Sequence, residues 1–450
     1  MQDLTTGSLS RHLLKTTSYM LVMMVFQTLY ILIDLYWVGR LGTAAVAAVG
    51  IAGNLSFVVL ALSQMLGVGT TAVVSHAVGR KDHDSARLLF NQSQVLSMLT
   101  GFAFLIIGLV TRWPYSIAMS ADADTASLAA AYLLWFVPAM ALQFAMVAMA
   151  AALRGVGNFK PGMVVATATV ILNMILAPIL IFGWGTGRAF GVTGAAISTL
   201  IAVVAGVVWL AMYFIGKEGY LHFNMGDWKP QFASWKSILV IGLPTGFEYG
   251  MLAIYLALVY SIARPFGAAA QAGFGIGQRI IMAGFMPVIA LGFAVAPVAG
   301  QNFGARLADR VKATFKNAAL MASGVMVLFI VVCNLVPAAL VGVFTNDPAV
   351  MIVGVEYLRI ISSNYVASGM IFVASSMFQA MGNTMPSLFA SAARIVLVLV
   401  PALVLARMPG FQLRWIWYLS AGAVWIQLAL SMLLLRREFG RRLGFEPIAA

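Results

Sequence analysis

The chain has 450 residues, of which 62% are hydrophobic and only 9% are charged. Soluble domains carry about 25% charged residues, so this chain lacks the polar residues to cover a soluble domain and is expected to lie in a lipid bilayer. One cysteine excludes an intramolecular disulfide, four histidines without ligand spacing argue against a zinc site, and the net charge of +13 comes without the basic, aromatic-lined module that nucleic-acid binding needs.

The predicted elements are twelve membrane-spanning helices, because each apolar run reaches the roughly 20 residues that cross the hydrocarbon core. In chain order they cover residues 17–38, 49–76, 88–111, 127–150, 162–183, 192–215, 238–261, 274–296, 317–344, 353–376, 388–407 and 414–436. Only the connection at 216–237 is long. We therefore expect an all-α polytopic membrane protein with a first lobe at 1–216, a cytoplasmic linker loop at 217–237 and a second lobe at 238–450.

Basic residues indicate the orientation, since lysine and arginine in short loops mark the cytoplasmic side. With the N-terminus inside, 18 of the 27 basic residues fall in cytoplasmic loops or tails, and two, Arg279 and Arg394, fall within spans. Both termini are therefore expected in the cytoplasm. The first apolar stretch has no small-residue cleavage site and is interpreted as a span, not a signal peptide. Together with the short loops, this indicates a bacterial inner (plasma) membrane protein.

The chain also repeats itself in three separate loops, always at the same offset of half the chain length. The corresponding segments are Gly42–Ile51 with Gly267–Ile276, Gly79–Phe90 with Gly304–Phe315, and Gly157–Pro161 with Gly382–Pro386. An offset of six helices preserves orientation, so the halves are parallel repeats related by an axis along the membrane normal. Repeats of this kind are typical of transporters that work by alternating access.

Several motifs resemble the multidrug and toxic compound extrusion (MATE) family of transporters, with features between its NorM-type and DinF-type patterns. They are Asp34–Gly42 in the first helix, Ala152–Asn158 with Pro161, Asn173, Pro178–Gly183, Gly191–Ala196 and Gly242–Pro244. The resemblance implies two six-helix lobes in a V shape, and coupling of H⁺ or Na⁺ entry to the export of bulky, often cationic amphiphiles. No cofactor is expected, and the lack of paired catalytic groups argues against an intramembrane enzyme.

Two acidic residues, Asp34 and Glu248, lie well inside apolar spans. A carboxylate there costs on the order of 3 kcal/mol and marks a functional site. Burial disfavours its charged form, so such a group can bind and release a proton. The resemblance assigns Asp34 to the family's cation or proton site. Glu248 is similar to a glutamate that NorM-type members carry about one turn later, on the same helix face.

The chain departs from both family patterns. Ala177 stands where DinF-type members carry an aspartate four residues after Asn173, and the span 353–376 has no acid beyond Glu356 at its mouth. Because a Na⁺ site needs several hard oxygen ligands, H⁺ is favoured over Na⁺ as the coupling ion.

Alternatives remain for five residues. Asp34 can be a structural carboxylate that accepts hydrogen bonds from the backbone across a helix interface. Glu248 can form an ion pair with Arg279, as a fixed scaffold or as a switch. Asn173 can serve beside Asp34 or simply join two helices. Arg394 has no obvious acidic partner in its helix and is interpreted as snorkelling or bonded to carbonyl groups.

A substrate cavity is expected between the lobes, lined by flexible methionines and aromatic rings that tolerate varied amphiphiles. Ordinary packing or lipid contact explains any one of these residues equally well. The candidates are Tyr36, Phe247, Tyr249, Met251, Tyr255 and Met282.

The sequence therefore predicts a monomeric multidrug exporter whose partners are small amphiphilic substrates and the lipid bilayer, with no nucleic acid and no metal. In this hypothesis, external protons load Asp34 and Glu248, with Asn173 beside Asp34. One alternative is a lipid-linked precursor flippase of the same superfamily, which would need a more cationic cavity. A non-transporting membrane scaffold is another, although no loop is large enough for a docking module.

Overall fold

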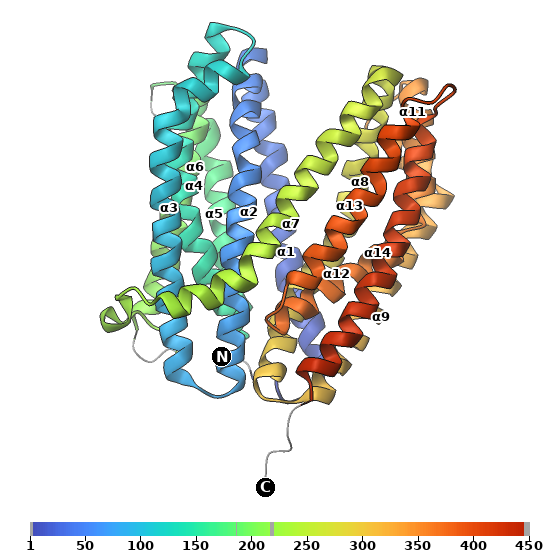
Figure 1. The fold of residues 1–450 in the computed structure, drawn as a ribbon. Coiled ribbons are helices and arrows are strands. Elements are labelled where there is room, and N and C mark those ends of the chain that lie inside the picture. The colour runs from blue at the N-terminus through green and yellow to red at the C-terminus, as the bar shows by residue number, and fades with distance from the viewer. Residues whose placement is uncertain (1–2, 186, 217–219, 445–450) are drawn as a thin grey trace. The chain divides into compact units, whose positions relative to one another are not determined.

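The computed structural model describes residues 3–185, 187–216 and 220–444, and every regular element within these residues is a helix (Figure 1). The first half contains α1 (Leu9–Gly39), α2 (Thr43–Gly79), α3 (His83–Met119), α4 (Ala123–Gly155), α5 (Phe159–Phe182) and α6 (Val192–Ile215). The short η1 (Met225–Trp228) leads into α7 (Phe232–Ala263), η2 (Arg264–Phe266) and α8 (Ala268–Gly304). The remaining helices are α9 (Ala308–Leu335), α10 (Pro337–Gly342), α11 (Pro348–Ser362), α12 (Tyr365–Ala380), α13 (Met385–Leu405) and α14 (Leu413–Arg442).

The number of spans agrees with the predicted twelve. Within the described residues, eleven helices are long and apolar enough to cross a membrane, and α11 with α12 supplies a twelfth if the pair forms one span. Most helices extend beyond the predicted spans, as α2 does at Thr43–Gly79 against the predicted 49–76. The all-helical, polytopic fold class is thereby confirmed.

The predicted tenth span is not one straight helix, because α11 and α12 meet at an angle of 57°. Serine hydroxyls at the break donate to the backbone, from Ser362 to the Arg359 carbonyl at 3.1 Å and from Ser363 to the Ile360 carbonyl at 2.7 Å. Such local bonds compete with the helical ladder and bend helices. The chain therefore bends here without a proline. The predicted ninth span, 317–344, is also divided, since α10 begins at Pro337.

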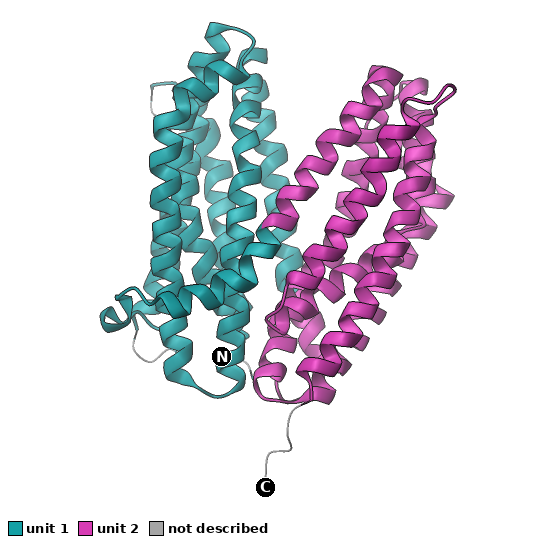
Figure 2. Cartoon of the chain, in the orientation of Figure 1, with its two compact units in different colours: residues 1–3, 18–246 teal, residues 4–17, 247–450 magenta. Residues whose placement is uncertain are grey.

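The chain divides into two compact units (Figure 2). The first comprises Met1–Asp3 and Ser18–Gly246, and the second comprises Leu4–Thr17 and Phe247–Ala450. These bounds differ from the predicted lobes at 1–216 and 238–450, because α1 and α7 each change unit along their length. Residues 217–219 of the predicted linker lie outside the described residues.

Specific contacts fix the first part of α7 in one unit and the segment that precedes α1 in the other. In the first unit, a Cβ atom at Gly242 of α7 would collide with the Met65 carbonyl oxygen of α2, so only glycine permits this approach. In the second unit, Leu4 donates its backbone N–H to Gln301 Oε1 at 3.1 Å, and Asn302 Nδ2 donates to the Leu4 carbonyl at 3.1 Å. Each unit thus holds the start of the helix that continues into the other.

Apolar clusters fill the interior of both units. In the first, Phe90 stacks on Phe214 with ring centroids 4.5 Å apart. In the second, Phe274 stacks on Trp417 at 5.2 Å, and Tyr357 meets Trp417 edge-on at 4.7 Å. Buried polar side chains lie among these apolar residues in each unit, for example Asn91 in the first and Gln301 in the second.

Candidate functional site

The first candidate site surrounds Asp34 on α1. One of its carboxyl oxygens, Oδ1, is buried and has no hydrogen-bond partner among the described residues. The carboxyl group lies close enough to the hydroxyl groups of Tyr30 and Tyr132 for its charge to act on both. Asp34 therefore sits beside neutral hydroxyl groups.

Asn173 of α5 joins the same cluster through Thr199 of α6. Its Nδ2 donates to Thr199 Oγ1 at 3.0 Å, and that hydroxyl donates to the Ala195 carbonyl, also at 3.0 Å. Thr199 Oγ1 lies 3.4 Å from the Tyr30 hydroxyl oxygen. Since the Thr199 proton already goes to the carbonyl, Tyr30 is the donor. The three residues link α5, α6 and α1.

Asn173 also has an acceptor without a donor. The residue is 4% exposed, and its Oδ1 is buried with no partner among the described residues. Ala177, one turn later, is a buried apolar residue at the position where DinF-type members carry an aspartate. The cluster around Tyr30 thus contains two acceptor oxygens, on Asp34 and Asn173, that lack donors.

The second candidate site surrounds Glu248 on α7. Its Oε1 accepts from Ser391 Oγ at 2.5 Å, and Ser387 Oγ lies 3.2 Å from Oε2. Both serines belong to α13, and Ser391 also accepts from Gln427 Nε2 of α14 at 3.3 Å. Neutral donors therefore surround this carboxylate.

The ion pair between Glu248 and Arg279 that the sequence permits is absent from the described chain. Arg279 is exposed on α8, whereas the Glu248 carboxylate points to the α13 serines. Ion pairs among the described residues include Arg87 with Asp84, Arg87 with Asp227, and Arg442 with Glu438. Glu248 thus interacts with hydroxyl groups in place of a cation.

The six predicted cavity residues differ in exposure. Tyr36, Phe247 and Met282 are exposed by 53%, 64% and 57% respectively. Tyr249, Met251 and Tyr255 are half-buried. In a chain of this class, exposed apolar side chains can contact lipid or substrate, so a role in substrate binding stays a prediction.

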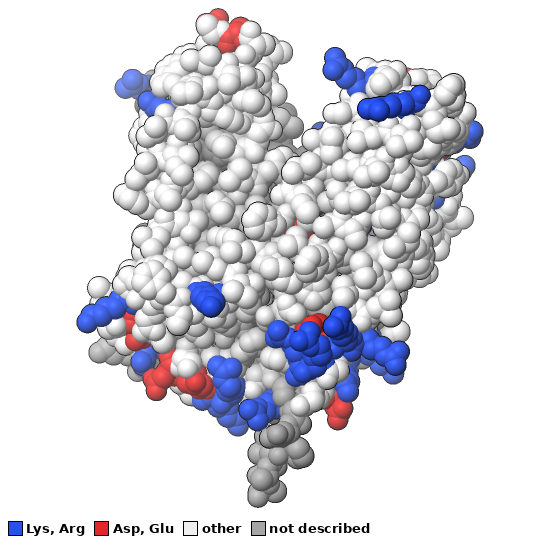
Figure 3. Space-filling view, viewed as in Figure 1, with Lys and Arg blue, Asp and Glu red and all other residues white. Residues whose placement is uncertain are grey.

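The charged residues lie mainly at the ends of the units. Figure 3 shows Lys and Arg gathered at one end of each unit, the end where α2 passes to α3 and α8 passes to α9. At this end of the first unit, a cavity of ≈ 540 Å³ is lined by His83, Arg87, Asn158, Tyr213, Tyr220, His222 and neighbouring apolar residues. Within the described residues, no three His, Cys, Asp or Glu side chains are placed to hold a metal ion.

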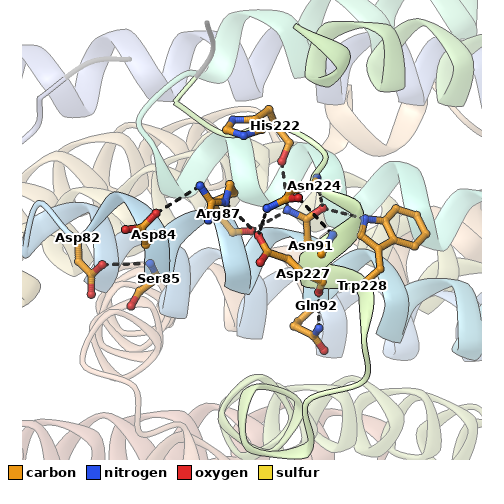
Figure 4. A network of polar contacts seen from close by, with 11 residues as sticks. Asp82, Asp84, Ser85, Arg87, Asn91, Gln92, His222, Asn224, Asp227 and Trp228 are labelled. Atoms are coloured by element: carbon orange, nitrogen blue, oxygen red, sulfur yellow. Dashed lines mark hydrogen bonds and ion pairs between the residues drawn. The ribbon is translucent and has the colours of Figure 1, made fainter. Parts of the chain in front are cut away.

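A polar network beside this cavity fastens the segment 220–231 to α3 (Figure 4). Arg87 Nε donates to Asp227 Oδ2 at 2.9 Å, and Asn91 Oδ1 accepts from Trp228 Nε1 at 2.9 Å. Gln92 Nε2 donates to the Lys229 carbonyl at 2.7 Å. Arg87 belongs to the repeated segment Gly79–Phe90, and it has a structural role in this network.

The sequence profile of the MatE family matches residues 20–179 and 244–404. This chain belongs to the MatE family. The profile thus matches once in each half of the chain, and the spacing of the two matched stretches agrees with the internal repeat. Members of the family are transporters, so the MatE assignment explains why the polar groups of both units lie inside long apolar helices.

Curated relatives of this MatE chain cover most of its length. The "Probable multidrug resistance protein NorM" of Thermotoga maritima is 25% identical over 80% of this chain and 78% of its own. The "Multidrug export protein MepA" of Staphylococcus aureus strain NCTC 8325 is 27% identical over 81% and 80%. A protein named "FAD transporter" in Shewanella oneidensis is 24% identical over 82% of both.

Solved MatE structures share the fold. A MOP superfamily transporter from Pyrococcus furiosus, described as having a binding pocket of reversed polarity that suggests a different function, superimposes with a TM-score of 0.91. The two are 25% identical, and the match covers 99% of this chain and 98% of that one.

Proposed function

We propose that this MatE chain is a secondary multidrug efflux transporter that exports amphiphilic, mainly cationic compounds in antiport with H⁺ by alternating access. Two relatives named for multidrug resistance and multidrug export support the substrate class. The parallel repeat supports alternating access, since transporters with such repeats move one half against the other.

The buried carboxyl group of Asp34 carries the proposal for the coupling ion. Its Oδ1 has no donor in the described chain, and its neighbours Tyr30 and Tyr132 are neutral. A carboxyl group in apolar surroundings without a cationic partner favours its protonated form. Asp34 can therefore take up a proton from one side of the membrane and release it on the other.

Sodium is the weaker candidate for the coupling ion. A Na⁺ ion at this cluster would have the oxygens of Asp34, Asn173, Tyr30 and Thr199 as ligands, with a single carboxylate among them. Hard cations prefer sites with several oxygen ligands and enough negative charge to offset dehydration. A proton needs only the Asp34 carboxyl group.

Each acidic residue then has a distinct task. Protonation of Asp34 removes a buried negative charge, weakens the attraction for a cationic substrate and permits tighter packing of the helices around it. Tyr30, Thr199 and Asn173 orient the cluster through their hydrogen bonds. In the second unit, Ser387 and Ser391 hold the Glu248 carboxyl group in a fixed direction toward α13.

The proposed location is a bacterial inner membrane, with both termini in the cytoplasm and the protein acting as a monomer. The basic ends of the units (Figure 3) support this orientation, because lysine and arginine accumulate on the cytoplasmic side. The relatives named for multidrug export do not favour the flippase or the scaffold.

Reconstitution tests the proposal most directly. Purified protein in liposomes receives an imposed H⁺ or Na⁺ gradient separately, and the efflux of a fluorescent cation is followed. We expect the H⁺ gradient to drive efflux, and Asp34→Asn to reduce it to the rate of protein-free liposomes because asparagine cannot carry the proton. Asp124→Asn, at an exposed acid on α4 of the same unit, serves as the matched control.

Two outcomes would contradict this proposal. Efflux driven by Na⁺ alone would assign the coupling ion to sodium. Normal H⁺-driven efflux by the Asp34→Asn variant would remove Asp34 from the coupling step.

A further inference from the structure

The second unit carries a basic surface where the start of α9 lies beside the end of α14. The rings of Phe315 on α9 and Phe439 on α14 are in contact, with 6.2 Å between their centroids. Side chains three or four residues apart share one face of a helix. Lys312 therefore lies on the same face of α9 as Phe315, and Arg436 lies on the same face of α14 as Phe439. Figure 3 shows Lys and Arg gathered at this end of the unit.

Six basic side chains of this surface are exposed and have no hydrogen-bond or ion-pair partner within residues 3–185, 187–216 and 220–444. Two further arginines are engaged, since Arg442 pairs with Glu438 at 2.9 Å and Arg310 donates to Asn302 Oδ1 at 2.8 Å. Asp309, in the first turn of α9, forms no ion pair within the same residues. We call the six exposed residues the basic patch: Arg306, Lys312, Lys316, Arg436, Arg437 and Arg441.

Like charges face one another within the basic patch. Lys312 and Lys316 are four residues apart on α9, and Arg437 and Arg441 are four residues apart on α14. Like charges at this spacing lie on one helix face and destabilise the helix. Orientation in the membrane requires only an excess of basic residues on one side, not unpaired cations one turn apart. The repulsion within the patch therefore favours binding of an anion from outside the chain.

Exposed leucines one turn deeper in each helix indicate which kind of anion fits. Leu320 follows Lys316 by four residues on α9 and is 63% exposed. Leu433 precedes Arg437 by four residues on α14 and is 66% exposed. Both helices are long and apolar enough to span a membrane, so these leucines are placed to contact acyl chains. Basic side chains that come one turn after exposed apolar ones match the order of phosphate and acyl chain in a phospholipid.

We propose that the basic patch binds anionic phospholipids of the cytoplasmic leaflet, with the lipid phosphate at the basic side chains and the acyl chains along Leu320 and Leu433. Clusters of about four to eight basic residues beside a membrane span bind anionic lipids, and each residue contributes about fivefold to the affinity. The inference uses the proposed orientation of the basic ends. It uses neither Asp34 nor Glu248, so it goes beyond the proposed export function.

Retention of lipids by the purified protein tests the basic patch. The protein in detergent receives equal amounts of phosphatidylglycerol, which is anionic, and phosphatidylcholine, which is neutral overall. Native mass spectrometry then counts the lipids of each kind that stay bound. We expect the unsubstituted protein to retain phosphatidylglycerol in preference to phosphatidylcholine.

Two variants with equal losses of charge locate the binding surface. The test variant removes four charges from the basic patch: Lys312→Gln, Lys316→Gln, Arg436→Gln and Arg437→Gln. It should lower the preference for phosphatidylglycerol by about tenfold or more, because each lost cation weakens the attraction. The matched control removes four charges from exposed side chains of the first unit, and it should keep the preference: Arg80→Gln, Lys160→Gln, Lys229→Gln and Lys236→Gln.

Two further measurements separate lipid binding from other effects. Arg436→Lys together with Arg437→Lys keeps the charge and should keep the preference, since a lipid phosphate is attracted mainly by charge. A large excess of soluble glycerol phosphate should not displace the lipid, because glycerol phosphate has no acyl chains to lie along Leu320 and Leu433.

Four outcomes would overturn the proposal. The unsubstituted protein could retain both lipids equally, or the test variant could keep the full preference. An equal loss in the matched control would assign the effect to net charge and not to the patch. Displacement by glycerol phosphate would assign the patch to a soluble anion. None of these outcomes bears on H⁺-driven export or on orientation, which are measured separately.

Discussion

Thr199 is the residue through which three helices of the first unit share one hydrogen-bonding group. Its hydroxyl oxygen accepts from Asn173 and lies 3.4 Å from the Tyr30 hydroxyl, while its proton goes to the Ala195 carbonyl. Asn173 and Thr199 are 4% and 6% exposed, so water cannot readily replace a lost partner and a buried group is left unpaired. The position of the Asn173 side chain therefore depends on a hydroxyl group on another helix.

A Thr199→Val substitution tests this dependence, because valine keeps the shape and removes the hydroxyl. We expect a loss of about 1–3 kcal/mol, the cost of leaving the Asn173 amide without its acceptor. Thermal unfolding in detergent measures the effect. Thr111→Val, at an exposed hydroxyl on α3 that also donates to its own helix, should change the midpoint little. Equal shifts for both variants would contradict the role of Thr199.

At the scale of elements, side chains of α3 bind the backbone of the segment 220–231 and fasten it to the helix. Asn91 Oδ1 accepts from the Asn224 backbone N–H at 3.1 Å, and Gln92 Oε1 accepts from the Gln231 N–H at 2.9 Å. Arg87 adds an ion pair to Asp227 (Figure 4). This segment comes directly before α7, so its docking sets where α7 begins.

Removal of the Asp227 carboxylate should loosen the segment. The Arg87 and Asp227 side chains are 28% and 17% exposed, so solvent screens the pair only in part. Asp227→Ala is expected to lower the local opening free energy by about 1 kcal/mol and to speed amide exchange in 220–231 about fivefold. Asp84→Ala removes a partner that is 88% exposed and should have little effect. No difference between the two variants would contradict the anchoring role.

The start of α3 should respond to pH through Asp82, which caps the helix. Its carboxylate accepts from the Ser85 hydroxyl and from the Ser85 backbone N–H at 3.0 Å, and these bonds lower the pKa of Asp82 below its ordinary value. A lowered pKa stabilises the fold above the unfolded pKa of about 3.9, and this contribution is lost as pH falls through the folded pKa. The difference in thermal-unfolding midpoint between the unsubstituted protein and Asp82→Asn should therefore shrink below about pH 3.9. A difference that stays constant with pH would contradict the capping role of Asp82.

At the scale of the whole molecule, the basic ends of the units predict one orientation in the membrane. Asp309, in the first turn of α9, is exposed at the basic end, and Asp347 is exposed just before α11. In a Cys333→Ser background, we expect an impermeant thiol reagent to label Asp347→Cys on intact cells. Asp309→Cys should be labelled only after the membrane is permeabilised. The reverse pattern would place the basic ends outside.

Much of the fold could be predicted because hydropathy and charge act locally along the chain. The apolar runs predicted the spans, and the internal repeat agrees with the two stretches that match the MatE profile. The break between α11 and α12 was missed, since Ser362 and Ser363 bond to their own backbone in a way that apolar content does not reveal. The division of α1 and α7 between units was missed because it depends on contacts such as Gly242 with Met65.

The sequence by itself determined which residues are exceptional, because a charge inside an apolar span is conspicuous in any arrangement. Asp34, Glu248 and Arg394 were visible in this way. Tertiary structure decided their partners: hydroxyl groups near Asp34 and Glu248, and a tyrosine ring at Arg394. The physical reason is that the cost of burying a charge follows from local composition, whereas the groups that offset this cost come from helices far away in the chain.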